Sequence, residues 1–176
     1  MNKHYNSGLV IGRFQPLHKG HEMIINTALS FCDKVYIYIG SAQISRCENN
    51  PYNYEERKHM IELAFPKAIK QGRIIIKPLY DMGYGNCTTW GQYVLDVFKN
   101  DNNILPDLYL TGCEKERSSW FSNEIAPNMD ELRLTRHNIK ISGTECREAL
   151  KLDKNNILKE NISYNVLRYI KKLCIV

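Results

Sequence analysis

Short runs of β-branched and aromatic residues alternate with segments of helical periodicity along this 176-residue chain. The first two runs, at 8–11 and 35–39, flank a segment at 21–31 whose apolar residues recur at helical spacing. Strands that alternate with helices predict an α/β fold, in which helices cover both faces of a parallel sheet. The expected strands are 8–11, 35–39, 74–76, 108–110 and 132–134, and the expected helices are 21–31, 54–65, 90–98, 118–123, 144–150 and 166–170.

Length and composition favour a single globular domain. Hydrophobic residues make up 43% and charged residues 24% of the chain, which excludes disordered, collagen-like and coiled-coil proteins. A chain of this length buries roughly two-thirds of its surface when it folds. We therefore expect one domain over 1–176, with a short helical appendage from about 151 onward.

The cysteines and the apolar runs indicate the compartment. The six cysteines include no CxxC pair, so neither a zinc knuckle nor a redox motif is expected. A disulfide framework is also not expected in a chain this long, which leaves reduced thiols. No apolar run approaches the ~18 residues of a membrane span, and the polar start at 1–7 does not resemble a signal peptide. We expect a cytoplasmic protein with no membrane partner.

The net charge of +5 is concentrated near the end of the chain. Residues 140–176 contain eight basic and four acidic side chains, whereas 1–139 contain 16 and 15. This basic segment is either a solvated helix face or a positive rim for a polyphosphate ligand. No basic stripe with interleaved aromatics occurs, so we expect no nucleic-acid partner.

The most informative segment, Gly-Arg-Phe-Gln-Pro-Leu-His-Lys-Gly-His, follows the first expected strand at 12–21. Its two histidines, His18 and His21, lie where a helix should begin. A helix N-terminus exposes backbone N–H groups and a partial positive charge, and it therefore favours anions. Gly12 and Gly20 would let a ligand approach the backbone closely. The segment predicts a phosphate-binding site.

A second segment, Ile-Ser-Gly-Thr-Glu-Cys-Arg, lies far downstream at 141–147. Ser142 or Thr144 can cap the following helix, and the same cap can form part of a phosphate site. Arg147 would then point back toward the phosphates. Open parallel sheets bind ligands outside the carboxyl ends of their strands, so we expect the loops that follow the strands to form the site.

Together the two segments resemble the HxGH and ISxTxxR motifs of the nucleotidylyltransferase superfamily, in the right order and about 120 residues apart. The first segment as a whole resembles the nicotinamide mononucleotide (NMN) adenylyltransferases of archaeal type and their Nudix-fused relatives. Gly-Ser-Ala-Gln at 40–43, Asn-Pro-Tyr at 50–52 and the pair Glu56-Arg57 are similar to the same family. The resemblance covers roughly residues 8–150 and implies a Rossmann-like sheet of about five strands.

The resemblance also implies an activity, the transfer of AMP from ATP to NMN with NAD and pyrophosphate as products. The phosphate oxygen of NMN would attack the α-phosphorus in line, so catalysis would consist of positioning and charge stabilisation. ATP and NMN would be the small-molecule partners, and Mg²⁺ would be held by the ATP phosphates rather than by side chains. A homo-oligomer is implied as well.

The implied site residues form three groups. The catalytic residues would be His18, His21, Arg147 and Arg13, with His18 nearest the α-phosphate. The ATP site would comprise Gly12, Arg13, Phe14, His18, Gly20, His21, Gly112, Ile141, Ser142, Thr144 and Arg147. The NMN site would comprise Gly40, Ser41, Arg46, Asp81, Asn86 and Trp90.

Some assignments stay open because the sequence departs from the family pattern. Asn86 and Trp90 are four positions apart rather than three, so Trp90 either stacks on the nicotinamide or is a core aromatic. Arg46 is either a phosphate ligand or a solvated loop residue. Lys115 and Arg117 either reach phosphates or remain surface charges.

Other functions are weighed against this one. The acceptor could be nicotinic acid mononucleotide, FMN or phosphopantetheine, although the Gly-Arg-Phe-Gln form and the segment with Asp81, Asn86 and Trp90 favour NMN over the last two. The protein could also be a module that senses NAD or ATP without turnover. Such a module would not need both the HxGH and the ISxTxxR motif, so their presence argues against this alternative. A class I aminoacyl-tRNA synthetase fragment would require a KMSKS-like lysine loop, which is missing. The sequence also contains no P-loop and no nucleophile elbow.

Overall fold

The computed structural model describes residues 4–83, 87–112, 120–134 and 142–173. Five parallel strands form one sheet in the order β3-β2-β1-β4-β5. The strands are β1 (Tyr5–Gly12), β2 (Cys32–Ile39), β3 (Ile74–Pro78), β4 (Leu108–Thr111) and β5 (Asp130–Arg133). The predicted α/β fold with a parallel sheet of about five strands is confirmed.

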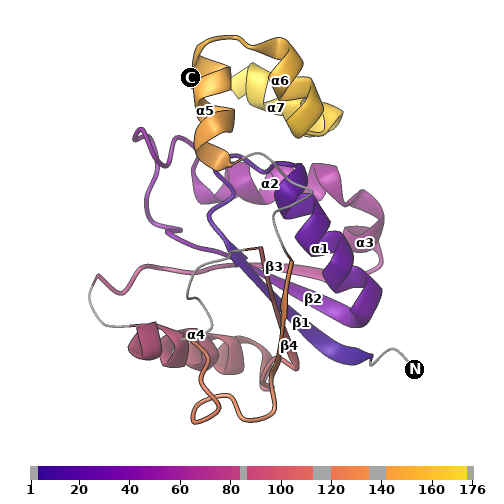
Figure 1. Cartoon of the computed structure of the whole chain (residues 1–176), viewed down its shortest axis with the longest axis vertical. Coiled ribbons are helices and arrows are strands. Elements are labelled where there is room, and N and C mark those ends of the chain that lie inside the picture. Colours follow the sequence, from indigo (N-terminus) through magenta and orange to yellow (C-terminus); the bar gives the residue numbers. More distant parts are fainter. Residues whose placement is uncertain (1–3, 84–86, 113–119, 135–141, 174–176) are drawn as a thin grey trace.

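Helices cover both faces of the sheet, with α1, α2 and α3 on one side and α4 on the other (Figure 1). Val10 and Ile37 face the first group of helices, whereas Leu9 and Tyr38 face α4, because alternate side chains of a strand point to opposite faces. The helices are α1 (Lys19–Phe31), α2 (Tyr54–Ala64), α3 (Pro66–Lys70), α4 (Cys87–Asn102), α5 (Gly143–Lys151), α6 (Asn155–Asn161) and α7 (Tyr164–Leu173).

The strand order reverses at β1. The chain builds β1, β2 and β3 toward one edge and then crosses back through α4 to place β4 on the other side of β1. The loops that follow β1 and β4 therefore diverge, and they open a crevice at the carboxyl ends of these strands. This crevice is where a ligand site is expected.

The structure corrects the sequence prediction at one helix. Of the expected helix at 118–123, residues 120–123 adopt bends and a turn, and 118 and 119 lie outside the described residues. The carbonyl of Ser122 accepts hydrogen bonds from the N–H groups of Ile125 and Ala126, which closes a single turn. The neighbouring Trp120 and Phe121 rings pack against aromatic residues of α4 and β4, so tertiary contacts shape this segment.

Two helices were not predicted. Pro66 directly follows the helix expected at 54–65 and begins α3, because proline at the first helical position sacrifices no hydrogen bond. The short helix α6 contains few apolar residues and shows no helical periodicity in the sequence. Among the described residues, no helix is long and apolar enough to cross a membrane.

The three C-terminal helices are packed onto the rest of the fold (Figure 1, orange to yellow). Helix α7 contacts α2, and its apolar residues Val166, Leu167 and Ile170 are buried in the same core as Met60 and Ile61 of α2. The appendage expected from about 151 therefore shares the main core. That 1–176 folds as one unit stays a prediction.

Candidate active site

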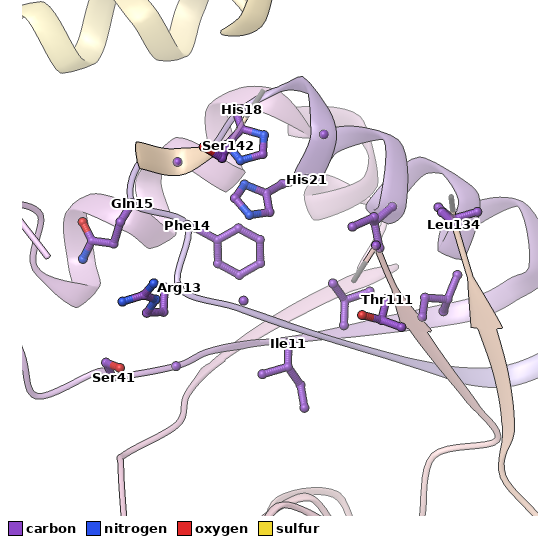
Figure 2. Close-up of a pocket in the computed structure, with 18 of the residues that line it drawn as sticks. Ile11, Arg13, Phe14, Gln15, His18, His21, Ser41, Thr111, Leu134 and Ser142 are labelled. Carbon is purple, nitrogen blue, oxygen red and sulfur yellow. The ribbon is translucent and has the colours of Figure 1, made fainter. Parts of the chain in front are cut away.

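A cavity of about 400 Å³ lies at the carboxyl ends of the central strands (Figure 2). Loops after β1, β2, β3 and β4 contribute to its lining, as do α1, α4 and α5. The predicted site residues that line it are Gly12, Arg13, Phe14, His18, Gly20, His21, Gly40, Ser41, Asp81, Trp90, Gly112, Ser142, Thr144 and Arg147. Segments more than 120 residues apart in the sequence thus meet at one site, as the motifs predicted.

The two histidines of the first motif stack on each other at the start of α1. Their ring centroids are 3.8 Å apart with 27° between the ring planes, and the Phe14 ring follows at 4.8 Å from His21. Figure 2 shows these three rings as a column along one wall of the cavity. His18 is the N-cap residue of α1, but its side chain makes no capping hydrogen bond. The His18 ring therefore lines the cavity and does not cap the helix.

Gly12 is required by the position of Phe14. Phe14 has a φ of 52°, in the left-handed region that is unfavourable for residues other than glycine. This backbone turns the phenyl ring over Gly12, where an added Cβ would lie only 3.0 Å from a ring carbon. The glycine was interpreted as a point of ligand approach, and the structure adds that it makes room for the aromatic column.

Arg147 connects three parts of the site. It is 8% exposed and donates to the Gln15 carbonyl at 2.9 Å, to Asn49 Oδ1 at 3.3 Å and to Thr144 Oγ1 at 3.1 Å. Burial, followed by repulsion from Arg13, lowers the pKa of its guanidinium. Two arginines in one cavity repel each other unless an anion lies between them, so this pair favours a polyanionic ligand.

The start of α5 fits closely against the loop after β1. Ser142 caps the helix by accepting from the Glu145 N–H, and Glu145 accepts from the Ser142 N–H in return, which forms a capping box. A Cβ on Gly143 would lie 3.2 Å from the Gln15 carbonyl oxygen. Of the two candidate caps, Ser142 and Thr144, it is Ser142 that caps α5, and Gly143 lets the helix start approach the first motif.

Two further residues position the loops. Gln15 exchanges hydrogen bonds with the Tyr52 backbone, donating to its carbonyl at 2.7 Å and accepting from its N–H at 3.0 Å. Arg57 is fully buried and donates to the carbonyls of Arg13, Gly40 and Ser41 at 2.8 to 3.1 Å. Burial lowers the pKa of its guanidinium to about 10. No local pattern reveals this role of Arg57, because its partners follow two different strands.

Ser41, Asp81 and two indole rings form another part of the cavity lining. Ser41 donates to Asp81 Oδ1 at 3.1 Å, and the Asp81 N–H donates to Gln43 at 3.2 Å. Trp90, on α4, lies against Trp120 with 4.1 Å between ring centroids and 52° between planes. Trp120 also lines the cavity, although the sequence analysis did not assign it to the site. The scarcity of tryptophan in the sequence could have drawn attention to Trp120, because the chain contains only two tryptophans.

Arg46 lies outside this cavity. Its guanidinium makes two 2.7 Å contacts with the Glu56 carboxylate and donates to the Pro51 carbonyl at 2.9 Å. These contacts lower the pKa of Glu56. Arg46 instead lines a second cavity of about 360 Å³ beside α5, so its binding of NMN stays a prediction.

Four other residues weighed in the sequence analysis, Asn86, Lys115, Arg117 and Ile141, lie outside the described residues.

The fold and the site define an α/β protein with a basic and aromatic cavity at the carboxyl ends of its strands, and its sequence places it in a known family. The model of the cytidylyltransferase-like family matches residues 9–149. The chain therefore belongs to this family.

Individual relatives are more specific. The chain is 35% identical over 108 residues to a nicotinamide-nucleotide adenylyltransferase of Thermococcus onnurineus, a match that covers 58% of this chain and 57% of that protein. It is 34% identical over 139 residues to a nicotinamide/nicotinic acid mononucleotide adenylyltransferase of Acinetobacter baylyi, which covers 79% and 72%. The chain thus spans little more than half the length of the archaeal relative.

A solved structure shares the fold. The bifunctional NMN adenylyltransferase/ADP ribose pyrophosphatase of Francisella tularensis, complexed with AMP and a manganese ion, is 33% identical with a TM-score of 0.64. The match covers 82% of this chain and 41% of that one.

Proposed function

We propose that the protein transfers AMP from ATP to NMN and releases NAD and pyrophosphate. The observation that carries this proposal is the composition of one cavity, whose lining combines the stacked histidines and two arginines with Asp81 and two indoles. The histidines and arginines suit phosphates, and the indoles suit a flat aromatic base. The names of the similar adenylyltransferases support the same activity.

The ATP phosphates would lie against the start of α1. There the backbone N–H groups of the first turn and the helix dipole attract anions, and His18 and His21 add donors. Arg13 and Arg147 would neutralise the charge of the leaving pyrophosphate.

In the reaction, an oxygen of the NMN phosphate bonds to the α-phosphorus while the bond from that phosphorus to the bridging oxygen breaks. The electron pair leaves with pyrophosphate, and no protein nucleophile is needed.

We propose that Mg²⁺ accompanies ATP and is held by its phosphates and by water. Among the described residues, no group of three or more His, Cys, Asp and Glu side chains could hold an ion. The described lining of the cavity includes one carboxylate, Asp81, against two arginines and two histidines. This donor set suits phosphate oxygens better than a bare divalent cation. The Francisella tularensis structure contains a manganese ion together with AMP, which supports the use of a divalent metal.

The test is a panel of acceptors. The purified protein would be incubated with ATP and Mg²⁺ and either NMN, nicotinic acid mononucleotide, FMN or phosphopantetheine, with pyrophosphate and the dinucleotide product measured. We expect NAD and pyrophosphate with NMN. Turnover with only another acceptor would overturn the NMN assignment and keep the ATP site. Tight binding of ATP or NAD without turnover on any acceptor would indicate a sensing module.

Two further predictions accompany this function. We expect the protein in a reducing compartment such as the cytoplasm, in keeping with free thiols at Cys32, Cys47 and Cys146. We also expect a homo-oligomer, which sedimentation of the purified chain tests.

A further inference from the structure

Arg57, near the start of α2, is fully buried and contacts the loops that follow β1 and β2. The capping box of Asn53 and Glu56 fixes the start of the helix, and Arg57 Nε donates to the Asn53 carbonyl at 3.2 Å. In the described part of the chain, all hydrogen bonds of its guanidinium run to backbone carbonyls and none to a carboxylate. A charge without a carboxylate partner is costly to bury, so these carbonyls must compensate it.

The guanidinium continues the hydrogen bonding between β1 and β2 into the loops that follow them. At the strand ends, the Gly40 N–H donates to the Gly12 carbonyl at 2.9 Å. Arg57 Nη1 then donates to the carbonyls of Arg13 and Gly40 at 3.0 and 2.8 Å, and its Nη2 donates to the Ser41 carbonyl at 3.1 Å. Because one nitrogen joins a carbonyl from each loop, the guanidinium sets the spacing between the loops.

Two of these carbonyls directly precede residues with an unfavourable backbone conformation. Phe14 has a φ of 52° and Ser41 a φ of 49°, both in the left-handed region. The Arg13 carbonyl belongs to the peptide before Phe14, and the Gly40 carbonyl belongs to the peptide before Ser41. Such conformations persist only where the surrounding structure holds them, and Arg57 holds the peptide plane that precedes each one.

Both left-handed turns carry side chains of the proposed site. The Phe14 ring lies 4.8 Å from the His21 ring, and the Arg13 side chain lines the same cavity. The Ser41 hydroxyl donates to Asp81 Oδ1 at 3.1 Å. In the proposed function the first turn belongs to the ATP site and the second to the NMN site. One buried guanidinium therefore sets the relative placement of residues assigned to the two substrates.

We propose that Arg57 is a positioning residue, which holds the loops after β1 and β2 at the spacing that aligns the NMN phosphate with the α-phosphorus of ATP. This inference rests on the proposed function and adds to it a residue that is buried away from both substrates. In-line attack depends on the distance and angle between the reacting atoms, and a misplacement of about 1 Å can slow a reaction by about a hundredfold. The loss of Arg57 should therefore lower kcat more than it weakens substrate binding.

The first experiment compares Arg57→Met with a matched control, Arg73→Met. The Arg73 side chain also holds backbone carbonyls, but these lie around the start of β2, away from the cavity. Its guanidinium donates to Leu29, Cys32 and Asp33 at 2.6 to 3.2 Å. Both substitutions leave carbonyls without their donors, so both should lower the thermal stability.

The two variants should differ in their kinetics. At a temperature at which circular dichroism shows each variant folded, we expect Arg57→Met to lower kcat by about tenfold to a hundredfold, with the KM for ATP and for NMN changed by about threefold or less. Arg73→Met should keep the wild-type kcat. Wild-type kcat in folded Arg57→Met, or an equal loss of kcat in Arg73→Met, would overturn the proposal.

Arg57→Lys covers the case in which Arg57→Met does not fold. Lysine keeps the positive charge but supplies one nitrogen in place of the forked guanidinium, so it cannot hold all the carbonyls in the same geometry. We expect its kcat to lie below that of the wild type and, where Arg57→Met folds, above that of Arg57→Met. Wild-type kcat in Arg57→Lys would show that the charge alone suffices, and it would overturn the positioning role.

A double substitution tests how the effect reaches the site. Ser41→Ala removes the hydroxyl that contacts Asp81 but keeps the Ser41 carbonyl that Arg57 holds. If Arg57 places this hydroxyl, Ser41→Ala should change kcat/KM for NMN less in Arg57→Lys than in the wild type, because the two substitutions disrupt the same contact. Fully additive effects would count against the proposal. If the wild type converts NMN and the Arg57 variants keep its kcat, only this inference fails. If the wild type converts no acceptor, the proposed function fails together with it.

Discussion

At the scale of single residues, His18 offers the sharpest test of the proposed phosphate site. His18→Ala removes a ring that lines the cavity but makes no capping hydrogen bond for α1. We expect kcat to fall by about a hundredfold to a thousandfold, as for the loss of one donor to a developing charge, while the thermal melting temperature changes little. His59→Ala, which alters an exposed histidine on α2, is the control and should keep wild-type kcat. A His18→Ala enzyme with normal turnover would remove His18 from the mechanism.

Substitution of Arg147 is a less selective test of the chemistry than substitution of His18. Because its guanidinium holds Gln15, Asn49 and Thr144 together, its removal leaves buried acceptors without their donor as well as removing charge from the site. Loss of activity in Arg147→Ala would therefore combine a structural and a chemical effect.

At the scale of elements, the start of α2 is stabilised by an ionised Glu56. Arg46 donates two hydrogen bonds to this carboxylate and lowers its pKa from the ordinary value of 4.5. A group with a lowered folded-state pKa contributes stability that is complete above its unfolded-state pKa and is lost as the pH falls through the folded-state value. The ion pair between Arg46 and Glu56, which joins α2 to the loop before it, should therefore weaken at acidic pH.

Arg46→Met tests this dependence. We expect the variant to be less stable than the wild type at about pH 7, and the two free energies of unfolding to converge once the pH is below the folded-state pKa of Glu56. Urea denaturation at several pH values measures the difference. Lys67→Met removes an exposed positive charge from α3, and no ion pair involves this lysine within the described part of the chain, so it should show no such convergence. A difference between Arg46→Met and the wild type that is constant at every pH would contradict the account.

The contact between α4 and the turn at 120–126 depends on one glycine. In Gly91→Ala the new Cβ would lie 1.7 Å from the backbone oxygen of Trp120, so the turn must move. We expect a loss of about 1–3 kcal/mol, although alanine is the better helix former. In Gly112→Ala the clash, at 2.8 Å, is with the end of the flexible Ile24 side chain and should cost less. Thermal melts of both variants compare them, and equal losses would count against a rigid contact at Gly91.

At the scale of the whole molecule, the question is whether the C-terminal helices belong to one cooperative unit. Ile170 of α7 is 1% exposed in the main core, whereas Tyr164 of the same helix is 76% exposed. We expect Ile170→Ala to cost about 2–5 kcal/mol of unfolding free energy and Tyr164→Ala about 0.5 kcal/mol or less. Two separate transitions in Ile170→Ala, with the first confined to α5–α7, would show that these helices unfold independently.

Much of the architecture was predictable from local pattern. The runs at 8–11, 35–39 and 74–76 have the β-branched and aromatic composition of buried parallel strands, and all three are strands. The two motifs marked the site because each places glycine, a cap residue and a positive group where a helix begins. These signals reside in neighbouring residues and need no knowledge of the fold.

The sequence by itself therefore determined the α/β class, the alternation of strands and helices, and the identity of most residues that line the cavity. The tertiary structure alone decided that Arg57 holds the ends of two strands, that Arg46 pairs with Glu56, and that Trp120 joins Trp90. The reason is physical, because each of these contacts joins residues from different elements. Such contacts depend on how the elements pack, which periodicity and motif spacing do not encode.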